Sequence, residues 1–185
     1  PGRGIFAHDE RLFTVFGRTL YELDAAGVPT DRGTLAIDGN PATFDTNGDG
    51  GNELMVTSGG AGYILDLGTN ALTTPLASGS NFCGQIDGFL ISLNVSTSTF
   101  RISDSLDGQT WTGTQIAQRT DASDPWSAMA VVNGELVLLG NKTGSIWYNA
   151  GLPTFPFAQR PEGTFQVGIA AGYTLARFNG GLAWL

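Results

Sequence analysis

The sequence contains very few of the residues on which chemistry at a protein site most often depends. It has one Cys and one His. A single cysteine, Cys83, excludes an intrachain disulfide and a cysteine-based zinc site. His8, next to Asp9, could act as a general base, but no recognisable nucleophile accompanies it. We therefore interpret His8 as a turn or surface residue, and Cys83, which lies close to Phe82 and Ile86 in the sequence, as a buried and inert thiol.

Positive charge is also scarce. The chain has 9 Lys and Arg residues against 17 Asp and Glu residues, which gives a net charge of −8, and Lys142 is the only Lys. Tight binding to nucleic acid depends on clustered cations that neutralise phosphates. We therefore expect no direct high-affinity binding of nucleic acid. No apolar run approaches the roughly 18 residues of a membrane-spanning helix, and no signal peptide is visible, so we expect no membrane contact either.

Glycine and apolar residues, in contrast, are plentiful. The chain has 27 Gly residues, and hydrophobic residues make up 41% of it. The glycines show no three-residue period of the collagen type, so tight turns between short strands explain them better. No segment sustains the 3.6-residue apolar period of a helix. The sequence therefore predicts an all-β fold without a long helix.

One turn motif recurs along the chain. Asn133-Gly134 stands between two apolar runs, and Asn-Gly favours a two-residue hairpin turn because both of its residues need positive φ. Asp49-Gly50, Asp87-Gly88 and Asn179-Gly180 repeat this pattern, and Asp9-Glu10 is a copy without glycine. The glycines are about 38, 46 and 46 residues apart, which is in the range of propeller blades.

These turns predict four four-stranded antiparallel units and the start of a fifth. The expected units begin at Ile5, Pro41, Phe82, Trp126 and Gln166, and the fourth strands of the first and third units are expected at Thr34 to Ile37 and around Thr114 to Arg119. Stacked sheets bury both faces, as the apolar run from Leu136 to Leu139 requires, and a ring hides most strand edges. We therefore predict a β-propeller or partial propeller, with a β-sandwich as the runner-up.

The chain as a whole, residues 1–185, is expected to form a single domain. It lacks an initiator Met, and Leu185 falls inside a predicted strand. We interpret the sequence as a piece of a longer polypeptide. Unpaired strand edges near Leu182 to Leu185 could then pair with another copy.

Several stretches resemble one known family. They are Phe100 to Trp111, Asn133 to Gly140 with Ile146 to Gly151 and Phe155 to Phe157, and Gly59 to Ile64. Together they look like the packaged-DNA stabilisation proteins of short-tailed bacteriophages, over most of the chain. The resemblance implies a structural tail-hub protein without enzymatic activity. Such a protein has a propeller-like domain, assembles as a homo-oligomeric ring, and closes the portal channel to stabilise packaged DNA.

The same resemblance implies partners and a location. The partners would be other hub subunits, the portal and adaptor proteins, and the tail needle. The protein would reside in the virion tail after assembly in the host bacterial cytoplasm. Members of this family are considerably longer than the 185 residues of this chain.

Two motifs leave other functions open. Ser105-x-Asp107-Gly108-x-Thr110-Trp111 is one residue short of a sialidase Asp-box, and we expect a structural turn in which Asp107 accepts backbone N–H groups. A propeller glycosidase would also need a carboxylate–arginine pocket at the propeller axis. Asp45, Asn47 and Asp49 resemble the start of a calcium loop, as in a calcium-dependent adhesion propeller. We favour a polar hairpin connection there.

Four aromatic residues also allow two interpretations. Trp126, Trp147, Phe155 and Phe157 could form an exposed contact surface, although such residues more often fill the core between sheets. Overall the sequence predicts no catalytic, cofactor-binding or metal-binding residues and no cofactor.

Overall fold

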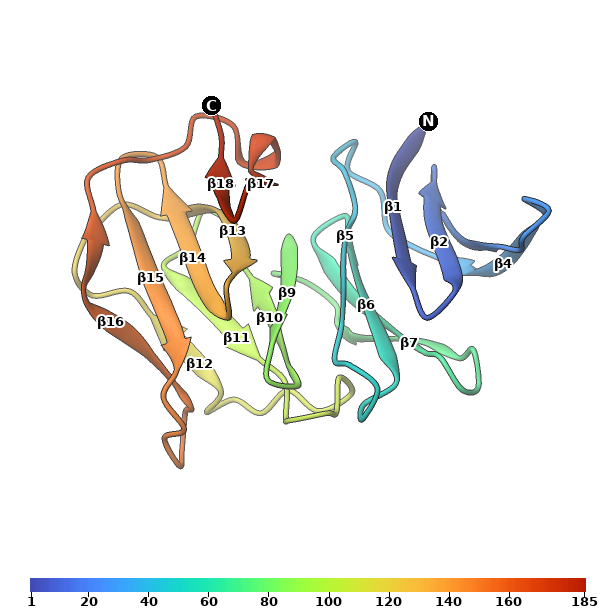
Figure 1. Cartoon of the computed structure of the whole chain (residues 1–185), viewed down its shortest axis with the longest axis horizontal. Helices are drawn as coiled ribbons and strands as arrows, with labels where there is room; N and C mark the ends of the chain where they lie inside the picture. Colours follow the sequence, from blue (N-terminus) through green and yellow to red (C-terminus); the bar gives the residue numbers. More distant parts are fainter.

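The computed structural model describes all 185 residues and is an all-β protein (Figure 1). Its strands form four antiparallel sheets of four strands each, and within each sheet the strands follow in sequence order. A two-stranded sheet comes last. The regular helical structure is a single 3-10 turn, η1 (Gly172–Thr174), so no helix is long and apolar enough to cross a membrane. The prediction of four-stranded antiparallel repeats is confirmed.

The first two sheets occupy residues 2–76. The first consists of β1 (Gly2–His8), β2 (Arg11–Phe16), β3 (Thr19–Leu23) and β4 (Pro29–Thr34). The second consists of β5 (Thr43–Thr46), β6 (Glu53–Ser58), β7 (Ala61–Asp66) and β8 (Leu72–Leu76).

The remaining sheets occupy residues 82–183. The third consists of β9 (Phe82–Ile86), β10 (Phe89–Leu93), β11 (Thr99–Ile102) and β12 (Ile116–Gln118). The fourth consists of β13 (Trp126–Val132), β14 (Glu135–Gly140), β15 (Gly144–Asn149) and β16 (Phe157–Phe165). The last sheet pairs β17 (Ala176–Phe178) with β18 (Gly181–Ala183).

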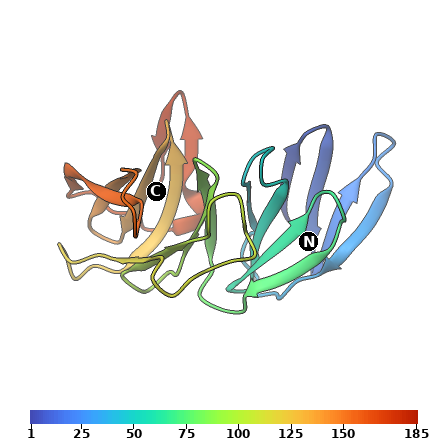
Figure 2. The same cartoon turned by 90° about the horizontal axis from the view of Figure 1, so that it is seen from below.

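The sheets are arranged as successive blades. Figure 2 shows the first two sheets on one side of the molecule and the later sheets on the other. Contacts between neighbouring sheets are made chiefly by their first strands, β1 with β5, β5 with β9, β9 with β13 and β13 with β17. These first strands are therefore the inner strands of the arrangement, and residues on them can meet although they are far apart in the sequence.

The hydrophobic core lies between the sheets rather than inside any one of them. One cluster, which includes Phe13 and Leu54, fills the space between the first and second sheets. A larger cluster, which includes Phe100 and Trp126, lies between the third and fourth sheets. The cluster between the second and third sheets is the smallest and contains Met55, Ile64, Leu76 and Leu90. Sheets in the middle of the stack therefore bury both faces, as the apolar pattern predicts.

The fourth strand of the first sheet differs from its prediction. It is β4, Pro29–Thr34, and not Thr34 to Ile37. β4 begins with Pro29, which has no N–H to donate to a ladder, and a strand at the outer edge of a sheet tolerates such a residue. Most of β4 is exposed, so it carries no apolar pattern that would reveal a strand in the sequence.

Four of the predicted turns have the expected geometry and one does not. Asn133 and Gly134 have φ values of 52° and 75°, and Val132 pairs with Glu135, as in a two-residue turn. Positive φ values also mark Asp9-Glu10, Asp87-Gly88 and Asn179-Gly180. At the fifth site, the residues with positive φ are Gly48 and Asn52 instead of Asp49-Gly50. The connection there is longer because Asn47 is used to bind Glu53.

Candidate functional site

Two adjoining cavities lie against the inner strands. The first has a volume of about 470 Å³ and is lined by Asp45, Gln85 and residues 131–134 and 177–181. The second, of about 280 Å³, lies among the inner strands, residues 41–45 and η1. Asp45, Val131 and Arg177 line both. These shared residues come from the second, fourth and last sheets, so the cavities mark the place where the inner strands converge.

Asp45 is the carboxylate of this site. Its Oδ1 atom accepts a hydrogen bond from the backbone N–H of Thr46 at 3.0 Å. Burial raises the pKa of Asp45 above its ordinary value, and the nearby positive charge of Arg177 opposes that rise. β9 passes close to β13 beside this carboxylate because Gly84 has no side chain. A Cβ atom there would lie 2.9 Å from the Cγ2 atom of Val131.

The second cavity has a more apolar lining. The rings of Phe82 and Tyr173 stack with their centroids 4.6 Å apart, which joins η1 to the third sheet. The Cys83 sulfur lies 3.3 Å from the hydroxyl oxygen of Thr43. Burial raises the pKa of the Cys83 thiol well above its usual range, so the thiolate needed for nucleophilic chemistry is disfavoured. This agrees with the interpretation of Cys83 as an inert thiol.

The two cavities contain few ionisable groups. Asp45 is their single carboxylate and Arg177 their single guanidinium group. A glycosidase needs two carboxyl groups on either side of the scissile bond. A sialidase-like site needs several arginines around a carboxylate. The propeller glycosidase alternative is therefore not favoured.

The Asp-box-like segment has a structural role. Asp107 accepts a hydrogen bond from the backbone N–H of Gln109 at 2.9 Å, as expected for this turn. The indole N–H of Trp111 donates to the carbonyl oxygen of Gly108 at 2.7 Å. Trp111 also packs on the small core cluster between the second and third sheets. These contacts fix the loop against the second sheet, away from the inner-strand cavities.

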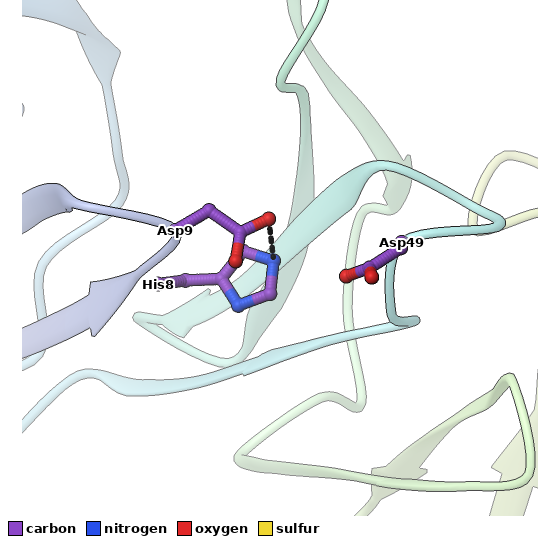
Figure 3. A group of neighbouring side chains, drawn as sticks. All are labelled: His8, Asp9 and Asp49. Carbon is purple, nitrogen blue, oxygen red and sulfur yellow. Dashed lines mark ion pairs between the residues drawn. The ribbon is translucent and has the colours of Figure 1, made fainter.

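The calcium-loop residues do not share one site. Asn47 is buried, its Oδ1 atom accepts the backbone N–H of Glu53, and its amide donates to the Glu53 carboxylate at 2.6 Å. That amide oxygen is thus occupied. Asp45 faces the inner-strand cavities, whereas Asp49 lies in a group with His8 and Asp9 (Figure 3). The polar hairpin connection describes this loop better than a calcium loop.

The four aromatic residues belong to the core. Trp126, Trp147 and Phe157 are buried, and Phe155 packs against the same cluster while partly exposed. Phe100 contacts the ring of Trp147 edge-on, with centroids 5.2 Å apart. The guanidinium group of buried Arg119 lies 4.3 Å from the ring centroid of Trp126. These side chains fill the core between sheets, as the second interpretation predicts. The interpretation of these residues as an exposed contact surface is wrong, because their surface is buried against neighbouring sheets.

One protein family accounts for this arrangement of sheets. The sequence model of the family described as "Bacteriophage P22 Gp10, beta-propeller" matches residues 1–185. The chain belongs to this phage stabilisation family. The family is described as a β-propeller of a phage, which agrees with the four four-stranded sheets, with the predicted propeller or partial propeller, and with the resemblance seen in the sequence. Among the curated proteins, none is similar enough to count as a match.

Solved structures support the propeller fold of this Gp10-family chain. The N-terminal domain of Nup159 has a TM-score of 0.57 at 12% identity, over 86% of this chain and 47% of that one. Hsv2 from Kluyveromyces marxianus has a TM-score of 0.54 at 11% identity, over 90% and 54%. The Pan2 WD40 domain of Neurospora crassa has a TM-score of 0.51 at 15% identity, over 79% and 48%. The chain thus spans about half the length of the propellers it matches, and these similarities concern the fold alone.

Proposed function

We propose that the chain is part of a structural head-completion protein of a short-tailed bacteriophage, which closes the portal channel and stabilises packaged DNA. The observation that carries this proposal is the match of the Gp10 family over residues 1–185. The protein has no enzymatic activity in this proposal, in line with the single carboxylate of the inner-strand cavities. It resides in the tail of the virion and assembles in the host cytoplasm.

The proposed partners are other subunits of the same hub, the portal and adaptor proteins, and the tail needle. Exposed apolar side chains support contacts of this kind, since Ile5, Phe16 and Phe178 are 66%, 60% and 72% exposed. The outer edge of β18 can also pair with a strand from another subunit. Interfaces that hold against the pressure of packaged DNA need to be large, in the range of about 2,000 Å² or more.

DNA retention in this proposal comes from a physical plug and not from binding of phosphates. The chain is acidic, and most of its arginines already form ion pairs within it, namely Arg3, Arg11, Arg32, Arg119 and Arg160. An acidic surface along the channel would repel DNA and let it slide past during ejection.

A deletion of the coding gene in the phage tests the proposal. We expect the mutant heads to package DNA and then lose it during purification, so that the genome becomes sensitive to nuclease. Supplying the full-length protein in trans should restore retention. A deletion mutant whose particles retain DNA and infect normally would contradict a head-completion role.

A further inference from the structure

Three side chains that can bind metal meet between the first and second sheets (Figure 3). His8 and Asp9 come from the end of β1 and its turn, and Asp49 comes from the loop between β5 and β6. One donor atom from each lies within 4.8 Å of the other two. Asp49 follows Asp9 by about 40 residues, so the spacing in the sequence does not match any metal motif.

We infer that His8, Asp9 and Asp49 form a binding site for one divalent transition-metal ion, with zinc as the representative ion. The donor set decides the class of metal. Calcium and magnesium favour sites made only of oxygen ligands, whereas an imidazole nitrogen with carboxylates suits zinc and its neighbours in the first transition row. Three protein ligands leave a fourth position for water, as in open zinc sites.

The geometry already fits for two of the three ligands. Nε2 of His8 lies 3.4 Å from Oδ2 of Asp9. Two ligands at zinc distances of 2.0–2.1 Å in a tetrahedron are about 3.3 Å apart. Only Asp49 has to move closer, by rotation of its exposed side chain. Its neighbours in the sequence are glycines, Gly48, Gly50 and Gly51. Few side chains in the loop can therefore obstruct this rotation of Asp49.

The charges at this place also favour a cation. Asp9 and Asp49 bring two carboxylates from different sheets together, and Asp49 forms no ion pair. Like charges at such separations repel each other. A divalent ion would remove that repulsion and connect the first sheet directly to the second. Bound there, the ion would cross-link two blades at the point where β1 ends.

A zinc titration of the untagged chain, by calorimetry and by competition with a chromogenic chelator, tests this inference. We expect one Zn²⁺ per chain with a dissociation constant in the micromolar range. His8→Ala and Asp49→Asn should each weaken binding at least as much as loss of an outer-shell partner does, by about 10- to 100-fold. Glu162→Gln is the matched control, since it removes an exposed carboxylate far along the chain on β16 and should leave the affinity unchanged.

Background binding is low because the chain has no other His and only one Cys. Circular dichroism of the metal-free variants shows whether they fold, and zinc should raise the melting temperature of the original chain but not of the two ligand variants. Calcium or magnesium in the millimolar range should not displace zinc. The inference is overturned if the original chain binds zinc more weakly than about 1 mM, or if folded His8→Ala and Asp49→Asn variants bind it as tightly as the original chain. These outcomes do not bear on the head-completion role.

Discussion

The carboxylate of Glu53, on β6 of the second sheet, accepts a hydrogen bond of 2.6 Å from the backbone N–H of Gly108, in the β11–β12 loop of the third sheet. Glu53 is buried and also accepts the amide of Asn47. The apolar cluster between these two sheets is the smallest in the protein. A charge-assisted hydrogen bond therefore supplements the packing at this blade interface.

Replacing Glu53 by Ala should destabilise the chain strongly. The change leaves the buried N–H of Gly108 and the amide of Asn47 without their acceptor. Each unsatisfied buried group costs about 1–3 kcal/mol, so we expect a loss of about 3 kcal/mol in the free energy of unfolding, measured with urea. Glu162→Ala removes an exposed carboxylate and should change stability by at most about 0.5 kcal/mol. Equal stabilities of the two variants would show that the Glu53 contact contributes little.

Replacing Gly134 by Val should destabilise the β13–β14 hairpin. A Cβ atom at Gly134 meets nothing within 4 Å, so the cost comes only from its φ of 75°, which a β-branched residue tolerates poorly. We expect a loss of about 1–2 kcal/mol. Gly113→Val is a matched control, because Gly113 also has open space around it but no positive φ. If the two valine variants have the same melting temperature, backbone strain at Gly134 is not the cause.

The parts of the fold that depend on local chemistry could be predicted from the sequence. Asn133-Gly134 and Asp87-Gly88 need positive φ, and this requirement is visible in the two residues themselves. The outer strand β4 could not be located from the sequence, because its residues are mostly exposed and show no alternation of apolar and polar side chains. The loop at Asp49-Gly50 was also placed wrongly, since its shape depends on the buried pair of Asn47 and Glu53.

The candidate sites depend on contacts between distant segments, and the sequence could not reveal them. Asp45 and Arg177 meet only because β5 and β17 are inner strands of different sheets. His8 and Asp49 likewise come from separate hairpins. The recurring turns predicted the propeller, and the family resemblance predicted the phage context. Asp45 and Asp49 are parts of one calcium-like loop in the sequence, but the sequence could not show that each lies next to a residue from another sheet.

The stability of the first sheet should depend on pH through Glu22. Hydrogen bonds from Arg11 and, to a smaller extent, from Arg32 lower the pKa of this carboxyl group from 4.5 to about 2, although burial opposes that shift. A carboxyl group with a depressed pKa in the folded state stabilises that state above its unfolded pKa. The stabilisation is lost as the pH falls through the folded pKa, here between about 4.5 and 2.

Comparison of the original chain with Glu22→Gln tests this pH dependence. The original chain should be the more stable of the two at pH 7, by about 1 kcal/mol because solvent screens the partly exposed ion pairs. The difference should shrink below pH 4.5 and vanish near pH 2. Melting temperatures at pH 7, 4.5, 3 and 2 provide the measurement. A difference that stays constant over this range would mean that the ion pairs of Glu22 do not stabilise the fold.

Duplex DNA should bind this chain only weakly, although its family stabilises packaged DNA. Counterion release rewards surfaces with free cations. The chain carries a net charge of −8, and the cations outside ion pairs are Arg18, Arg101, Lys142 and Arg177. They come from different sheets or loops, and Arg177 lies next to Asp45 at the cavities, so they form no continuous basic strip.

A titration of fluorescent duplex DNA at about 0.15 M salt measures this binding. We expect a dissociation constant weaker than micromolar and a shallow dependence on salt, since few phosphates can be neutralised. Arg101→Ala and Lys142→Ala should then leave the signal unchanged. A micromolar or tighter constant that weakens in either variant would reveal a basic patch and contradict retention by a physical plug. Weak binding would fit the proposed role, in which a physical plug holds the DNA, because an acidic surface can block a strand that it does not attract.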